Sequence, residues 1–329
     1  KSITYLLINY TKCIIFSFFH YTITKCIPLQ NYNLNLMNKY TIDHFSKITG
    51  LNKILIRTWE NRYNFVNPHR TSTNIRYYDD KMIVKALRYS TLVGIGFKMS
   101  NLTNLSEEQI DSLIINTLKT DDQTNKNSLY ISQIIESAIS YNQLFFHNTF
   151  EKCIKDIGIV KCYQNVLLKA LERIGILWIN DKISPPQEHF LSELIRTKFC
   201  KEIERIGFKK LPKENWVLFL PENELHDIGI LFAHLVLKMN GHNVVYLGQN
   251  LPYSSLLSLK EKNKIDNILF FVFSNSSRLN LPEINNFLET NFSESKINVI
   301  INDNLLGENN FQKLNTISSI DKFINLISI

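Results

Sequence analysis

The residues with the clearest chemistry lie in the hexapeptide 224–229, which follows an apolar run of strand length at 216–220. His226 offers an imidazole that can ligate a metal, and Glu224, two residues earlier, can orient that ring. Gly229 has no side chain, so the backbone there can approach a large flat ligand. A lone histidine after a strand is more often a hydrogen-bonded structural residue, so this pattern alone leaves both interpretations open.

Apolar runs of strand length alternate with helical stretches throughout this part of the chain. The expected strands are 216–220, 243–247, 268–274 and 297–301, and the expected helices are 227–240, 254–262 and 282–292. The alternation predicts a doubly wound parallel α/β sheet over residues 213–329, Rossmann-like with a flavodoxin-type strand order. Ligands on such sheets bind beyond the carboxyl ends of the strands. The residues expected at that edge are Glu224, His226, Gly229 and Ser274.

Residues 129–212 show helical periodicity almost throughout, which predicts a middle four-helix bundle. Within it, nine residues separate Trp178 from the pair Glu188-His189. Two prolines set the start of the helix that carries this pair. An indole at the end of one helix, with a carboxylate and an imidazole at the first turn of the next, could form the roof of a pocket. On its own, His189 would more often be a capping or surface residue.

The net positive charge of the chain is concentrated near the N-terminus. Residues 39–99 contain eleven Lys or Arg against four Asp or Glu, and the whole chain has a formal net charge of +7. A local positive field of this kind favours a polyanion, with nucleic acid as the first candidate. On charge alone, a merely solvated basic face stays open.

The residues from 41 to 63 have the spacing of a helix-turn-helix. Thr41 can cap a short amphipathic helix, Gly50 suits the turn, and Asn52 can cap a second helix. A β-hairpin wing follows at 68–79, and helices at 80–93 and 104–117 complete an α winged-helix domain of residues 37–118. Three aromatic residues are expected in its core: Trp59, Tyr63 and Phe65.

Positively charged and polar side chains on the second helix and the wing can contact DNA. Helix arginines can reach base edges or phosphates in the major groove, and wing residues can hold the backbone. The expected DNA-binding residues are Thr41, Asn52, Lys53, Arg57, Arg62, Arg70, Thr71, Arg76 and Tyr77.

This segment resembles the DNA-binding domain of the MerR family of transcription regulators. The matching positions are Tyr40-Thr41-Ile42, Thr49-Gly50, Arg57-x-Trp59-Glu60-x-Arg62-Tyr63, Pro68-x-Arg70-Thr71 and Arg76-x-Tyr78. The departures are Leu55 for a small hydroxyl residue, Asn61 for an arginine, and Asn64 and Asn74 for glycines. The resemblance implies binding to double-stranded DNA at a two-fold operator, and the departures should alter operator preference more than the fold.

The later motifs resemble those of the cobalamin-binding, light-sensing regulators of the CarH, CarA and LitR group. There, a Trp and a Glu-His pair enclose the adenosyl group, which implies that role for Trp178, Glu188 and His189. The hexapeptide, followed by residues 241–248, is similar to the cobalamin-binding Rossmann-like domain. The resemblance implies adenosylcobalamin as cofactor. The implied roles at the sheet are His226 as the axial cobalt ligand, Glu224 as its orienter and Ser274 as a partner of the nucleotide tail.

Two departures keep alternatives open. The stretch 301–304 reads Ile-Asn-Asp-Asn where that group usually has a Gly-Gly pair, so Asn302 and Asp303 would crowd the nucleotide tail. Ile179 stands where relatives can carry a histidine that captures cobalt after photolysis. One alternative is a cofactor-free regulator that uses the region for dimerisation. Another, from a different class, is a corrinoid methyl-transfer protein, although the basic winged helix argues against an enzyme.

The N-terminal segment, the polar stretch after residue 118 and the cysteines contain no further candidate site residues. Residues 1–36 contain no acid and precede Met37, and their longest apolar stretch is too short to span a bilayer, so we interpret them as a non-native or disordered leader. Residues 119–128 are polar and predict a linker. Five cysteines without metal-ligand spacing indicate a reducing cytoplasm.

These observations together predict a DNA-binding transcription regulator of repressor type that is not an enzyme and has no membrane segment. A ligand packed between the bundle and the sheet would favour one state of a homo-oligomer, either a dimer or a tetramer. That state would bind or release the operator, and light would act by removing the adenosyl contact with the roof.

Overall fold

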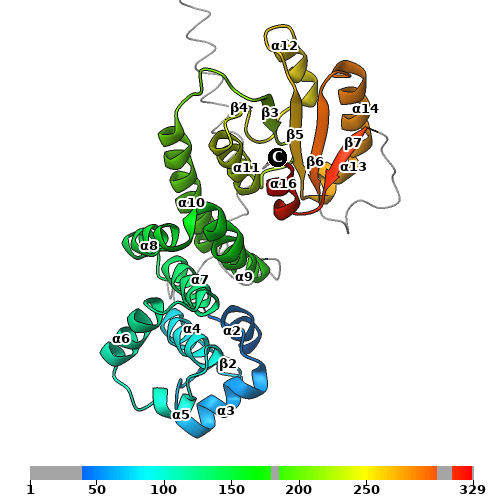
Figure 1. Cartoon of the computed structure of the whole chain (residues 1–329). Coiled ribbons are helices and arrows are strands. Elements are labelled where there is room, and N and C mark those ends of the chain that lie inside the picture. The colour runs from blue at the N-terminus through cyan, green and yellow to red at the C-terminus, as the bar shows by residue number, and fades with distance from the viewer. Residues whose placement is uncertain (1–38, 179–184, 302–312, 328–329) are drawn as a thin grey trace, which may run out of the picture. The chain divides into compact units, whose positions relative to one another are not determined.

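The computed structural model describes residues 39–178, 185–301 and 313–327 (Figure 1). The predicted leader, Ile179 and the stretch from Asn302 to Asn304 lie outside these residues. Among the described helices, none combines the length and the apolar composition needed to cross a bilayer.

The N-terminal domain is the winged helix that the sequence predicts. Its elements are α2 (Ile42–Thr49), α3 (Lys53–Tyr63), β1 (His69–Arg70), β2 (Arg76–Tyr77), α4 (Asp80–Gly94), α5 (Met99–Leu102) and α6 (Glu107–Leu118). The side chain of Thr41 accepts a hydrogen bond from the backbone N–H of His44, and that of Asn52 accepts one from Leu55. Both predicted caps are therefore confirmed.

Positive backbone φ angles occur at two turns of this domain. Gly50 ends α2 at φ 75°, and Asn74 takes φ 64° in the wing. Trp59 and Phe65 are buried and their rings meet edge to face at 5.5 Å, so their core role is confirmed. Tyr63 is only half-buried.

The middle domain contains four helical stretches. They are α7 (Gln123–Ile139), α8 (Gln143–Cys162), the π-helical turn η1 (Tyr163–Leu167) with α9 (Leu168–Trp178), and α10 (Pro185–Ile206). The prediction of a linker through residue 128 is wrong, because α7 begins at Gln123. Asp122 caps that helix by accepting from the N–H of Asn125, and its later turns are buried, so the polar first turns extend a helix that the core anchors.

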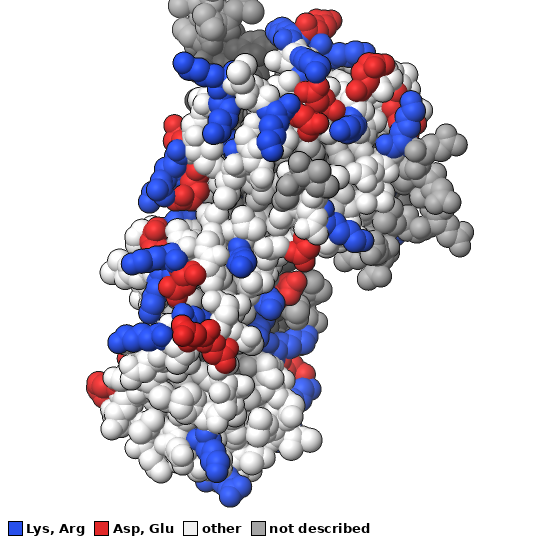
Figure 2. All heavy atoms as spheres, in the orientation of Figure 1, with Lys and Arg blue, Asp and Glu red and all other residues white. Residues whose placement is uncertain are grey.

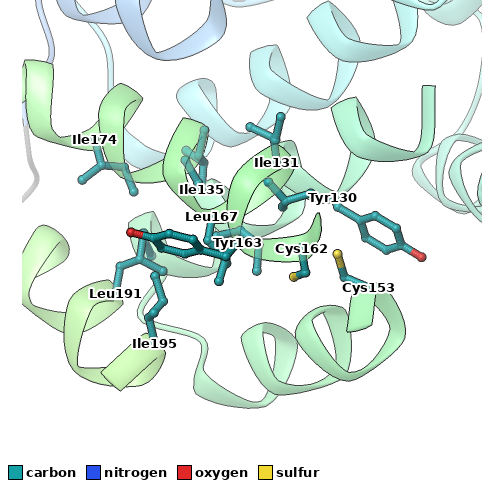
Figure 3. Packing of buried hydrophobic residues seen from close by; sticks show 14 of the residues in the cluster. Tyr130, Ile131, Ile135, Cys153, Cys162, Tyr163, Leu167, Ile174, Leu191 and Ile195 are labelled. Atoms are coloured by element: carbon teal, nitrogen blue, oxygen red, sulfur yellow. The ribbon is translucent and has the colours of Figure 1, made fainter. Parts of the chain in front are cut away.

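A break at Gly158 sets the course of the bundle. This glycine has φ 77° and ψ 160°, which are not helical values, so α8 bends there and the chain continues into η1 and α9. The core that results is visible in Figure 3, where Tyr163 and Leu167 lie between Ile135 of α7 and Leu191 of α10. Apolar burial between these helices stabilises the four-helix unit predicted from periodicity.

The C-terminal domain is a five-stranded parallel sheet. Its strands are β3 (Asn215–Phe219), β4 (Asn243–Tyr246), β5 (Asn267–Val272), β6 (Lys296–Ile301) and β7 (Leu314–Ile317), in the order β4-β3-β5-β6-β7. This is the flavodoxin-type order, which confirms the predicted fold class. The accompanying helices are α11 (Ile228–Met239), the 3-10 turn η2 (Tyr253–Leu256), α12 (Leu257–Lys260), α13 (Asn275–Leu279), α14 (Leu281–Asn291) and α16 (Ile320–Ile327).

Alternating strand residues build two cores, one on each face of the sheet. Leu218 and Phe271 pack with residues of α11 and α16, whereas Phe219 and Phe270 pack with residues of α14. Figure 1 shows these helices on opposite sides of the strands, as a doubly wound sheet requires. The sequence pattern did not predict β7, α13 or α16. Strand β7 is buried only at its two end residues, so it has no continuous apolar run to reveal it.

Candidate functional site

The most constrained side chain at the carboxyl edge of the sheet is Glu224. It is fully buried, and its two oxygens accept hydrogen bonds from both sides of the site. Oε2 accepts from the backbone N–H of Phe273 at 2.9 Å, from that of Ser274 at 2.8 Å and from the hydroxyl of Ser277 at 2.8 Å. Five donors in total fix this carboxylate, because Oε1 also accepts from the ring and from the backbone N–H of His226.

The ring of His226 is hydrogen-bonded to this carboxylate. Its Nδ1 lies 2.6 Å from Oε1 of Glu224, and its side chain is 65% exposed. Because a carboxylate can only accept, Nδ1 carries the proton in the neutral ring and Nε2 keeps its lone pair for a ligand. The structure therefore brings together the predicted orienter and the predicted axial ligand.

The two groups shift each other's pKa. Burial alone would raise the pKa of Glu224, but the bonds from His226, Ser274, Phe273 and Ser277 lower it well below the ordinary range. The hydrogen bond to Glu224 raises the pKa of His226, and the negative charge of Glu188 adds to this effect. The carboxylate is thus ionised at neutral pH, and it holds the imidazole in one orientation.

A second ionic contact, which the sequence reading missed, holds the same loop. Asp227, next to His226, accepts from Nη2 of Arg196 at 2.6 Å and from Nε of the same guanidinium at 3.1 Å. Gln249 also donates to Asp227, at 2.8 Å. Arg196 belongs to α10 of the bundle, so this bidentate pair joins the helical domain to the loop of His226. No local pattern links residues 31 positions apart, which is why spacing did not reveal it.

The expected roof residues lie at the ends of two helices of the bundle. Trp178 is the last residue of α9, and its side chain lies outside the described part of the structure. Glu188 and His189 lie in the first turn of α10. The hydroxyl of Ser192 donates to Glu188 at 2.6 Å, and the side chain of His189 is 70% exposed. The negative charge of Glu188 contributes to the raised pKa of His226.

Gly229 and Ser274, two of the predicted cofactor-binding residues, also have structural roles within the domain. A Cβ on Gly229 would lie 2.9 Å from Cε1 of Phe271, so the close approach that requires glycine is to this ring, inside the domain. The side chain of Ser274 caps α13 by accepting from the N–H of Ser277, while its backbone supports Glu224. Contact of either residue with a cofactor stays a prediction.

The donor set at this edge fits a cobalamin. A neutral imidazole held by a buried carboxylate is the arrangement that orients a histidine toward a metal. In addition, the loop lies at the carboxyl end of β3, beside the point where the strand order reverses. Groups of three or more His, Cys, Asp or Glu that could hold a bare metal ion are absent among the described residues. The Nε2 lone pair of His226, whose ring is held through Nδ1, is suited to a metal that a cofactor brings with it.

Some of the expected DNA-binding side chains are exposed, and others contact neighbouring residues within the domain. Arg57 and Arg62 lie on α3 and are exposed, and Lys53 in the same helix pairs with Asp43. Figure 2 shows Lys or Arg side chains at the end of this domain where α3 and α5 lie, without acidic neighbours in that view. Such a face can approach phosphates.

The wing residues are held by neighbours within the domain. Nη1 of Arg70 donates to the side-chain oxygen of Asn74 at 2.8 Å, and Nε of Arg76 lies 3.5 Å from Oε2 of the buried Glu60. The ring of Tyr77 stacks on that of His69 at 5.2 Å. Thr71 is exposed and bonded to the backbone of Ile75. Thr41 and Asn52 serve as helix caps.

Comparisons with known proteins bear on both ends of the chain. Residues 40–109 match the MerR HTH family regulatory protein model, and residues 130–199 match the B12 binding domain model. The chain carries a MerR-type DNA-binding domain and a B12-binding domain. The B12-binding match covers most of the helical bundle that contains the Glu188-His189 pair.

A curated relative is similar to this chain over about two thirds of its length. The chain is 23% identical over 220 residues to the HTH-type transcriptional repressor CarH of Myxococcus xanthus, which covers 66% of this chain and 73% of the relative. This similarity spans more than either domain alone.

Two solved structures are similar at low identity. The monomethylamine corrinoid protein of Methanosarcina barkeri has 15% identity and a TM-score of 0.47, and it covers 62% of this chain and 100% of its own. A cobalamin-binding protein of Desulfitobacterium hafniense DCB-2 has 13% identity and a TM-score of 0.32, with 59% and 95% covered. Both TM-scores lie below 0.5, so the fold class rests on the strands and helices of the chain itself.

Proposed function

We propose that this chain is a DNA-binding transcription regulator, of repressor type, whose operator binding is controlled by cobalamin. The observation that carries the proposal is the presence of a MerR-type domain and a B12-binding domain on one chain. The buried Glu224 with its exposed His226 supports it at the level of the site. The relative CarH is itself a repressor.

In this proposal, the residues at the sheet edge bind and orient the cofactor. His226 would offer Nε2 to the cobalt, while Glu224 keeps Nδ1 protonated and Arg196 fixes the loop through Asp227. Glu188 and His189, together with Trp178, would contact the adenosyl group. Bound adenosylcobalamin would supply a cobalt–carbon bond that light can cleave, and this would be the basis of a light response.

The DNA side works through exposed charge. Arg57 and Arg62 would enter the major groove, and Arg70, Arg76 and Tyr77 would hold the flanking backbone. A two-fold operator requires two copies of the domain, so the active species would be a dimer or a tetramer of this chain. The MerR-type domain favours a regulator over a methyl-transfer subunit.

The test is a spectrum combined with a size measurement. The purified chain is mixed with adenosylcobalamin in the dark and desalted, and the visible spectrum and molecular size are recorded before and after illumination. We expect retained corrinoid, with a spectrum that changes in His226→Ala. Loss of all corrinoid on desalting would contradict the proposal and favour the cofactor-free regulator.

A matched pair of variants shows whether the carboxylate acts as proposed. Glu224→Gln should weaken cobalt ligation, because a neutral amide holds the imidazole less firmly. Glu222→Gln removes an exposed charge two residues earlier and should leave the spectrum unchanged.

A further inference from the structure

A buried side chain next to the roof pair contacts the DNA-binding domain. Gln187 precedes Glu188 in the first turn of α10 and is 2% exposed. Its Nε2 lies 3.1 Å from the carbonyl oxygen of Ile139, at the end of α7, and 3.3 Å from the hydroxyl of Tyr40. Neither the resemblance nor the DNA-binding set accounts for this contact.

Tyr40 lies at the start of the winged-helix domain, just before the cap of α2. It is 1% exposed, and its hydroxyl donates to Oδ1 of Asp80, the first residue of α4, at 2.5 Å. Because that proton is used, the hydroxyl receives the amide N–H of Gln187 as an acceptor. One phenol therefore joins α10 of the B12-binding domain to α4 of the MerR-type domain.

The same tyrosine is linked by hydrogen bonds through Tyr78 to α3, the second helix of the helix-turn-helix. The backbones of Tyr40 and Tyr78 exchange two hydrogen bonds of 2.8 Å. The hydroxyl of Tyr78, which is fully buried, donates to Oε1 of Glu60 on α3 at 2.5 Å. Glu60 in turn faces Arg76 of the wing. A chain of buried polar contacts thus runs from the first turn of α10 to both DNA-contacting elements.

Burial makes this chain resist partial opening. A buried donor or acceptor that loses its partner costs about 1–3 kcal/mol, because water cannot replace the lost bond. A displacement of the first turn of α10 must therefore either move Tyr40 with it or leave the amide of Gln187 unpaired. Networks of this kind favour discrete arrangements over gradual adjustment.

We propose that Gln187 and Tyr40 are positioning residues that couple the cofactor site to the DNA-binding face. A cofactor seated against Glu188 and His189 fixes the first turn of α10, and Gln187 transmits that position through Tyr40 and Tyr78 to α3 and the wing. The inference rests on the proposed function, since it names how the same site is read out.

The first test uses the full chain without cofactor. Gln187→Met keeps the side-chain volume but removes the amide, and Tyr40→Phe removes only the hydroxyl. In a double-mutant cycle on urea unfolding, the two substitutions should be coupled by about threefold or more in the unfolding equilibrium constant. Additive effects would overturn the proposed contact.

The second test measures coupling directly. The ratio of operator affinities with and without adenosylcobalamin is measured in the dark, on a duplex selected by the wild-type chain from a random pool. We expect a wild-type ratio of about fivefold or more, falling toward one in both variants. Corrinoid affinity of Gln187→Met should stay within about threefold of wild type, since a coupling residue acts on the linkage and not on the ligand.

A matched control separates coupling from general destabilisation. Tyr130→Phe removes another buried phenol–carboxylate bond, the one to Asp156 within the bundle, and should keep the wild-type ratio. A wild-type ratio retained in Gln187→Met would overturn this inference while leaving the proposed function intact. A wild-type ratio of one, with corrinoid bound, would remove the proposed function and this inference with it.

Discussion

The loop of His226 and the exposed face of α3 hold their functional side chains in different ways. His226 is fixed by a buried carboxylate that accepts from five donors, and the next residue is held by a guanidinium from α10. Arg57 and Arg62 are exposed on α3. A metal ligand must be oriented before the ligand arrives, whereas a phosphate contact depends on reach and charge. Mutations should therefore damage the first region through stability and the second through affinity.

The largest effect is expected at Glu224. Replacing it with alanine leaves the buried N–H groups of Phe273 and Ser274 without an acceptor, and frees the ring of His226. Each buried donor left unpaired costs about 1–3 kcal/mol, so we expect a loss of roughly 2–6 kcal/mol in the free energy of unfolding, together with loss of corrinoid binding. Urea denaturation measures the first, and Glu222→Ala is the control. A variant as stable as wild type would show that the edge is not preorganised.

Arg57→Ala, unlike Glu224→Ala, should lower DNA affinity without lowering stability. Binding to the selected operator should weaken by about 1–3 kcal/mol, and the salt dependence of binding should fall by about one ion if the contact is to a phosphate. The melting temperature should not change, because the side chain is exposed. Fluorescence anisotropy at several salt concentrations provides the measurement. Unchanged affinity would move the DNA contacts away from this face of α3.

Arg76 is the position where the two behaviours should mix. Its guanidinium faces the buried Glu60, so Arg76→Ala should lower both operator affinity and the free energy of unfolding, the latter by about 1 kcal/mol. Arg70→Ala, whose partner Asn74 is exposed, should lower affinity alone. Equal stability of the two variants would contradict a supporting role for the ion pair.

The smallest effect concerns pH and contrasts two histidines of the C-terminal domain. Burial lowers the pKa of His234 to about 4, so folding disfavours its charged form and stability should fall as the pH drops from about 6.5 toward 4. His226 has a raised pKa, so its contribution is present below about 6.5 and is lost as the pH rises through the folded-state value.

Unfolding titrations across this range separate the two groups. His234→Phe should remove the acid-side loss of stability, and His226→Ala should remove the contribution that fades at higher pH. His189→Ala, a substitution of an exposed histidine, is the control. The same pH profile in all three variants would contradict these assignments.

The parts that the sequence predicted are those encoded locally. Thr41 and Asn52 cap their helices because side chain and N–H lie three residues apart, and Glu224 reaches His226 because only one residue separates them. The parallel sheet followed from the alternation of strands and helices. Periodicity and capping patterns capture such short-range constraints.

The parts that were missed depend on partners distant in the chain. The pairs Arg196–Asp227 and Gln187–Tyr40 join residues 31 and 147 positions apart, and no spacing rule indicates them. The polar stretch after Asp122 read as a linker because its burial begins only further along α7. The close approach of Gly229 to Phe271 also joins residues distant in the chain, and contact of Gly229 with a cofactor stays a prediction.

The affinity of the full-length chain for its selected operator, measured in the dark with and without bound adenosylcobalamin and again after illumination, tests the central proposal most directly. We predict that the cofactor changes the affinity by about fivefold or more, and that illumination reverses the change. Identical affinities in all three states, with corrinoid shown to be bound, would contradict control of DNA binding by the B12-binding domain.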